Sequence, residues 1–194
     1  MLLLTSGHPT SGHPTSGLTR SLAGRLVRRL IFALMLAMFL AISLTGATGR
    51  AMAADFDKAK AAYEAGDYAT AAQEFRPLAE AGDAKSQFNL GLMHDNGQGV
   101  PQNYAEAMSW YRRAAETGHA KAQYNLGFLY TNGKGVPQDY ITAHMWANLA
   151  ASNSNDLSTG LRAIIASEMS PAEIERAQAR AAQCLASNYQ DCGG

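Results

Sequence analysis

The sequence predicts an all-α fold, an α/α solenoid (superhelix) of about three or four stacked helical hairpins. Residues 84–119 and 120–155 align without a gap at a period of 36 residues, with 17 identical positions. Each copy holds two helical patterns of apolar residues with a glycine-rich turn between them. A period of about 20 to 50 residues is typical of solenoids, because a single hairpin buries its apolar face only against a neighbour.

The first helix of each repeat is expected to end before a glycine. In the earlier copy it covers about Ala84–Asp95, and Gly97 follows at a position where glycine can take the left-handed conformation that closes a helix. Gly91 in the earlier copy and Gly127 in the later one lie inside the first helix, where each costs about 1 kcal/mol relative to alanine. That cost indicates a helix crossing with no room for a side chain.

The second helix of each repeat is expected to begin at an N-cap residue, which is Asn103 in one copy and Asp139 in the other. Glu106 stands three residues after Asn103, the spacing of a capping box. Trp110 and Trp146 share their helix face with alanines, which predicts that both tryptophans belong to the core. The apolar positions of the first copy are Ala107, Trp110, Tyr111, Ala114 and Ala115.

Weaker copies flank the two repeats. Residues 54–83 are expected to form a degenerate tetratricopeptide-like unit, because Tyr68–Ala84 matches the second half of the repeat. Residues 156–194 are expected to supply two capping helices and a tail. Ser170 begins the last helix with an N-cap, a proline and the glutamate of a capping box. Its polar outer side suits the end of a solenoid, which no further hairpin covers.

Residues 1–53 are predicted to be a leader that opens with a low-complexity tract. Arginines precede the apolar run Leu30–Gly46, and Ala51–Ala53 has the small-x-small pattern of a signal-peptidase site. Cleavage would give a periplasmic or secreted protein. Without cleavage, the same run would anchor the chain in the membrane, since its length is at the lower limit for a span.

The chain has two cysteines, Cys184 and Cys192. In an exported protein an even number suggests one disulfide, here one that pins the C-terminal tail, and two free thiols are the alternative. Two cysteines are too few for a zinc site.

Charge and motifs exclude several function classes. The net charge is zero, yet from residue 54 onward 11 Lys and Arg stand against 16 Asp and Glu, a net charge of −5. This argues against a nucleic-acid partner, which requires clustered positive charge. No H-E-x-x-H, G-x-S-x-G or S-x-x-K motif occurs. His94, His119 and His144 do not follow the repeat period, and no metal site, cofactor or catalytic residue is predicted.

The glycine-rich turns resemble a phosphate loop only superficially. A G-x-x-x-x-G-K-[ST] loop requires a hydroxyl after its lysine, whereas Gly135 follows Lys134. The turn also recurs with Gln98 in place of the lysine, although a nucleotide site needs only one copy. We therefore interpret both glycine pairs as structural turns.

The pattern A-x-x-x-x-x-L-G, then G-x-G-V-x-x-D/N-Y and A-x-x-W-x-x-x-A-A, resembles the Sel1-like repeat family, a relative of the tetratricopeptide solenoids. The likeness covers Ala54 to about Cys184. It implies an α/α superhelix that holds other proteins, often in the bacterial envelope. A cysteine-rich branch of this family binds or hydrolyses β-lactams, with a cysteine pair inside every repeat. In those pairs seven residues lie between the two cysteines. Cys184 and Cys192 have the same spacing but lie beyond the two central repeats.

A strip of polar residues on the first helices is the candidate partner-binding surface. Its members lie within about 40° of one another on a helical wheel and recur identically in both repeats. Stacked hairpins would align them on the concave wall, where solenoids usually bind. Capping of helices and tying of loops are the alternative roles for its asparagines. This polar strip consists of Lys85, Asn89, Asn96, Lys121, Asn125 and Asn132.

Together these patterns predict an exported, non-enzymatic interaction module, or adaptor, of the cell envelope. Its partner would be a protein or peptide recognised on a preformed wall, with little ordering cost. The alternative is binding of a glycan or peptidoglycan fragment, or a β-lactamase-like hydrolase activity.

Overall fold

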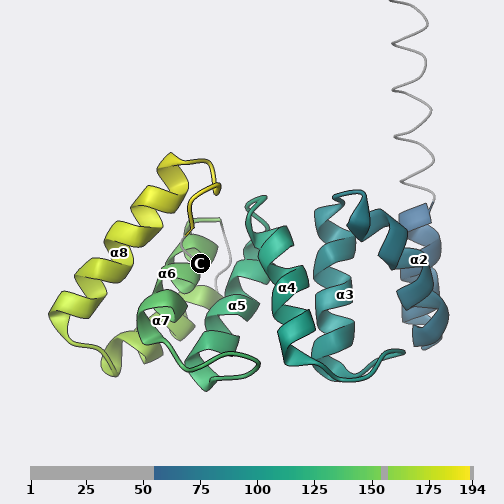
Figure 1. The fold of residues 1–194 in the computed structure, drawn as a ribbon, viewed down its shortest axis with the longest axis horizontal. Helices are drawn as coiled ribbons and strands as arrows, with labels where there is room; N and C mark the ends of the chain where they lie inside the picture. The colour runs from purple at the N-terminus through teal and green to yellow at the C-terminus, as the bar shows by residue number, and fades with distance from the viewer. Residues whose placement is uncertain (1–54, 154–156, 193–194) are drawn as a thin grey trace, which may run out of the picture. The chain divides into compact units, whose positions relative to one another are not determined.

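The computed structural model describes residues 55–153 and 157–192, and these residues form an all-helical solenoid without a strand (Figure 1). This confirms the predicted fold class. The predicted leader, residues 1–53, lies outside the described part. None of the helices in the described part is both long and apolar enough to cross a membrane. After helical residues 55–64, the helices are α2 (Tyr68–Glu80), α3 (Ala84–Asn96), α4 (Tyr104–Ala115), α5 (Ala120–Asn132), α6 (Tyr140–Ser152), α7 (Leu157–Ser167) and α8 (Pro171–Ala186).

From α2 to α7 each helix packs against the next, and α8 packs on α6 at the end of the row (Figure 1). Buried apolar side chains form one cluster around α2 to α4 and a larger one around α4 to α8. The tryptophans lie in these clusters as predicted, with Trp110 6% and Trp146 0% exposed. The repeated tryptophans therefore stabilise the stack.

N-caps begin the second helices at the predicted residues. Asn103 accepts hydrogen bonds from the backbone of Ala105 and Glu106, and Asp139 makes the equivalent bonds at α6. Asn103 and Glu106 do not form the expected capping box in the described residues, because the Glu106 side chain does not bond the Asn103 amide. The reason is that the Asn103 amide donates instead to the His94 carbonyl, at 2.9 Å. The capping box at Ser170 is formed as predicted.

Each glycine-rich turn joins the two helices of one hairpin and packs against the preceding unit. Gly97 and Gly133 close α3 and α5 in the left-handed conformation, with φ of 68° and 63°. Gly99, at φ 69°, lies against the backbone of Tyr68 at the start of α2. Gly135 lies in the same way against Tyr104 at the start of α4, where an added Cβ would be 2.7 Å from the carbonyl carbon. Each turn thus docks on the preceding unit, which explains its two glycines without a nucleotide.

The mid-helix glycines mark close crossings, as predicted. A Cβ on Gly91 would lie 2.5 Å from two ring carbons of Tyr111 in α4. A Cβ on Gly127 would lie 3.1 Å from the Ala143 carbonyl oxygen in α6. Each first helix therefore contacts the second helix of its own hairpin through a bare backbone.

A buried glutamine links each repeat to the unit before it. The Gln87 side chain donates to the Ala79 carbonyl of α2, and the Gln123 side chain donates to the Ala115 carbonyl of α4, both at 3.0 Å. Because each bond satisfies a carbonyl in the last turn of the preceding helix, it fixes where that helix ends relative to the next repeat.

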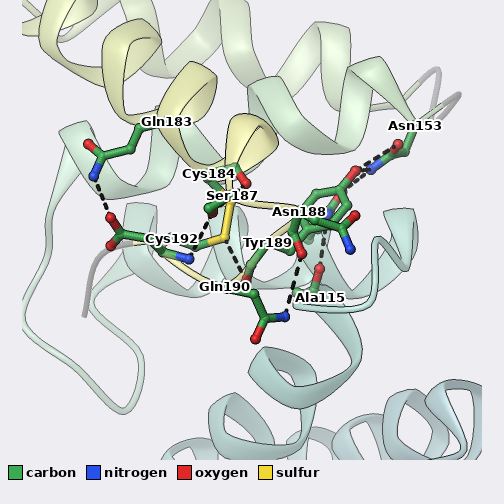
Figure 2. The surroundings of a disulfide bond; sticks show 11 residues. Ala115, Asn153, Gln183, Cys184, Ser187, Asn188, Tyr189, Gln190 and Cys192 are labelled. Carbon is green, nitrogen blue, oxygen red and sulfur yellow. Dashed lines mark hydrogen bonds between the residues drawn. A yellow bond between two sulfur atoms is a disulfide. The ribbon is translucent and has the colours of Figure 1, made fainter.

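The C-terminal tail folds back onto the repeats. Figure 2 shows the disulfide that joins Cys184 of α8 to Cys192 of the tail, with Cα atoms 4.4 Å apart. Tyr189 packs against Gly118, and its hydroxyl bonds the Asn153 amide at 2.9 Å (Figure 2). The tail and α8 thereby cover the last repeat.

Three histidines are wholly or partly removed from water. His94 is 8% and His144 2% exposed, and His119 is half-buried. Burial is the main cause that lowers the pKa of all three imidazoles below 6.5. His94 occupies the packing position that Tyr130 holds in the next repeat, and both side chains are 8% exposed. No group of three or more metal-ligating side chains occurs in the described ranges.

Replacement by alanine should have opposite effects on stability at Gly91, which lies at a close crossing, and at Gly160, which faces open space. Gly91→Ala should lower the free energy of unfolding by about 1–3 kcal/mol, because its Cβ overlaps the Tyr111 ring. Gly160→Ala in α7 is the control, since nothing lies within 4 Å of its added Cβ. It should stabilise the protein by up to about 1 kcal/mol through helix propensity. Urea unfolding measures both, and equal shifts of the same sign would contradict the crossing.

Burial of the histidines predicts acid sensitivity. Below pH 6.5, the ordinary imidazole pKa, the unfolded chain binds protons that the folded chain takes up only at lower pH. The free energy of unfolding should therefore fall as pH drops from about 7.5 to 5.5. His94→Tyr, which copies Tyr130, should reduce this loss. Urea midpoints at both pH values check the effect, and a midpoint that rises on acidification would refute it.

Candidate binding groove

A groove of about 360 Å³ lies between helical residues 55–64, α3 and the start of α5. Two of its side chains come from equivalent positions in the two repeats, Lys85 and Lys121. The stacking of one hairpin on the next therefore brings them to the same groove. We call this the N-terminal groove, lined by Phe56, Lys85, Phe88, Asn89, His119, Ala120 and Lys121.

Aromatic rings form much of its lining. The Phe88 and His119 rings are 4.8 Å apart between centroids, at an interplanar angle of 30°. The Lys85 ammonium lies 5.9 Å from the centroid of the Phe56 ring. Phe88 also contacts Tyr111, with centroids 5.9 Å apart, which couples the groove to the Gly91 crossing. The lining is thus largely aromatic, it contacts the core through Phe88 and Tyr111, and the lysines add positive charge to it.

His119 is placed by the start of α5. Its Nδ1 accepts a hydrogen bond from the Ala122 amide at 3.3 Å, the N-cap bond that Asp83 makes for α3. An Nδ1 acceptor requires the neutral imidazole. Burial lowers the pKa of His119 most, and the nearby Lys121 and Lys85 charges lower it further. The groove therefore carries an aromatic ring that stays neutral.

The structure divides the predicted polar strip. Lys85, Asn89 and Lys121 line the N-terminal groove. Two other members hydrogen-bond within the protein: Asn132 donates to the Phe128 carbonyl at 2.7 Å, and Asn96 donates to the Gln98 side chain at 3.3 Å. Asn125 lies near the Tyr111 hydroxyl, which donates to Asp95 Oδ2 at 3.2 Å, and burial raises the pKa of that phenol.

Sequence reasoning missed Phe56, Phe88 and His119 as groove residues. The signal for His119 was its place directly before the second repeat, where the first repeat has the N-cap Asp83. The signal for Phe88 was its position three residues after Lys85, on the same helical face. Phe56 carried no such signal, because the degenerate first unit does not align with the repeats in this half.

A second cavity of about 350 Å³ lies beside the disulfide. Its polar groups bond mainly to one another: Arg180 donates to the Thr142 hydroxyl at 3.4 Å, and that hydroxyl donates to Asp139 at 2.7 Å. Asp139 is also the N-cap of α6. The cavity therefore fits a structural junction between α6 and α8.

Comparison with known proteins agrees with this architecture. The Sel1 repeat model matches residues 84–119 and 120–155. No curated protein matches the sequence. Among solved structures, c5321, a protective antigen of uropathogenic Escherichia coli strains that displays an SLR fold, aligns with a TM-score of 0.68 at 28% identity. The alignment covers 73% of this chain and 31% of that one, so this chain spans about a third of its length.

A Sel1 repeat protein from Oxalobacter formigenes is 41% identical over 46% of this chain and 36% of that chain, with a TM-score of 0.45. Sel1 repeats generally mediate protein–protein interaction, typically as non-enzymatic scaffolds. The helical hairpins, the docked glycine turns and the family match agree, and they confirm the resemblance found in the sequence: this chain carries two Sel1 repeats within an all-helical solenoid.

Proposed function

We propose that this protein is an exported interaction module of the cell envelope, which holds a segment of a partner protein on the exposed face of its first helices. The observation that carries the proposal is the N-terminal groove, which spans two repeats and combines aromatic rings with polar groups. The general role of Sel1 repeats in binding proteins supports it.

Rigidity suits the groove to an extended segment. Phe88 and His119 are held by ring contacts and an N-cap bond, so their positions exist before a ligand arrives. Binding to such a surface costs little ordering of the protein side. Phe128 extends the same face along α5 and is 41% exposed. An extended chain crossing the groove would lie close to this second aromatic ring.

Export is supported by the leader-like composition of residues 1–53 and by the pairing of Cys184 with Cys192. Disulfides persist in oxidising compartments and are rare in the cytosol. A periplasmic or secreted location is therefore the proposed one, and an uncleaved leader would give a membrane-anchored form of the same module.

Site-specific photocrosslinking tests the binding face. A benzoylphenylalanine in place of Phe88 or Phe128 should form adducts with the same partner protein in intact cells. The matched control is Gln178, an exposed position on α8. Adducts of equal yield at Gln178, or none at either aromatic position, would reject the proposed face.

Thiol labelling and mass measurement test export. In chain isolated from cells, maleimide should label Cys184 and Cys192 only after reduction, because the disulfide protects both. The intact mass should show the loss of residues 1–53, or their retention together with the membrane fraction in the anchored form. Reduced thiols in chain from the cytosolic fraction would contradict export.

A further inference from the structure

Two lysines of the N-terminal groove form no ion pair within the described residues, although the Lys85 ammonium lies over the Phe56 ring. Lys85 and Lys121 are both exposed, and neither belongs to an ion pair of the described residues. The ion pairs in this part of the chain are Lys58–Glu74 and Lys60–Glu64. The groove thus presents two ammonium groups from equivalent positions of adjacent repeats.

The Asp83 carboxylate, two residues before Lys85, is already engaged. It accepts hydrogen bonds from the Ser86 amide at 2.7 Å and the Ser86 hydroxyl at 2.6 Å, and so caps α3. The equivalent position before α5 is His119, which brings no negative charge. Lys121 and Lys85 lower the pKa of this imidazole and Asp83 raises it, so both lysine charges reach the lining of the groove together with the capping carboxylate.

The other lining residues of the groove indicate which ligand groups would bind beside the carboxylates that the lysines attract. Phe56 and Phe88 offer aromatic surface for apolar side chains. The Asn89 side-chain amide lines the groove and makes no hydrogen bond within the described residues, so it can donate to and accept from a peptide backbone. Anionic ligands in general would satisfy the lysines, but the apolar surface and the free amide favour a peptide.

We propose that the N-terminal groove binds an acidic peptide segment of the partner, with carboxylates at Lys85 and Lys121 and apolar side chains on Phe56 and Phe88. This inference rests on the proposed function and names the chemistry of its ligand. Net charge does not account for it, since the chain from residue 54 onward is itself acidic, with 11 Lys and Arg against 16 Asp and Glu.

Fluorescence anisotropy with the purified full-length chain tests the proposal. The probe is a fluorescein-labelled peptide in which glutamates alternate with leucine and serine, and the matched peptide has glutamine in place of every glutamate. The acidic peptide should bind roughly tenfold more tightly, and added salt should weaken it. Lys85→Glu and Lys121→Glu should each weaken binding roughly tenfold, whereas Lys121→Arg should retain it.

The control for global charge is Arg176→Glu on α8, which makes the same charge change at an exposed site away from the groove. It should alter affinity less than about twofold. Equal binding of both peptides, or equal losses in all three charge reversals, would overturn the proposal.

A carboxylated glycan, hyaluronate oligosaccharide, separates peptide from glycan recognition. It should compete only weakly, and competition as strong as that of the acidic peptide would overturn the peptide assignment. The result is independent of the proposed function, because photocrosslinks at Phe88 without a preference for glutamate would leave protein binding intact and remove only the acidic chemistry.

Discussion

The contact on which this solenoid depends is the one between the second glycine of each turn and the backbone at the start of the preceding unit. Gly99 lies on Tyr68 and Gly135 lies on Tyr104, so both turns dock in the same way. A side chain at either glycine would hold the units apart, and a positive φ makes any other residue costly there. Because this docking fixes how far one hairpin is displaced from the next, it also decides that Lys85 and Lys121 share a groove.

Identical residues acquire different roles once the hairpins stack. Asn125 lies beside the Tyr111 hydroxyl of the preceding hairpin, whereas its equivalent Asn89 lines the N-terminal groove and has Phe75 at the position of that tyrosine. Repetition in sequence thus gave one prediction for both asparagines, although the preceding unit surrounds each of them differently.

This contrast shows how far the sequence was informative. Helix limits, the left-handed caps at Gly97 and Gly133, and the crossings at Gly91 and Gly127 are local consequences of residue type, and all were predictable. The capping box at Asn103 failed because the His94 carbonyl, nine residues earlier, competes for the same amide. The aromatic lining was missed for the same kind of reason: the closeness of Phe88 and His119 depends on stacking, which periodicity alone does not describe.

The lysine that the first helices of both repeats share does not recur in α7. One period beyond Lys121 falls on Leu157, the first residue of α7, which is 71% exposed. The charge pattern therefore spans two repeats and stops before the cap. Helices in neighbouring rows lie roughly 10 Å apart, and an extended chain advances about 3.3 Å per residue. Two lysines at this separation match carboxylates about three residues apart, so a short segment suffices, and its recognition is confined to the N-terminal half of the solenoid.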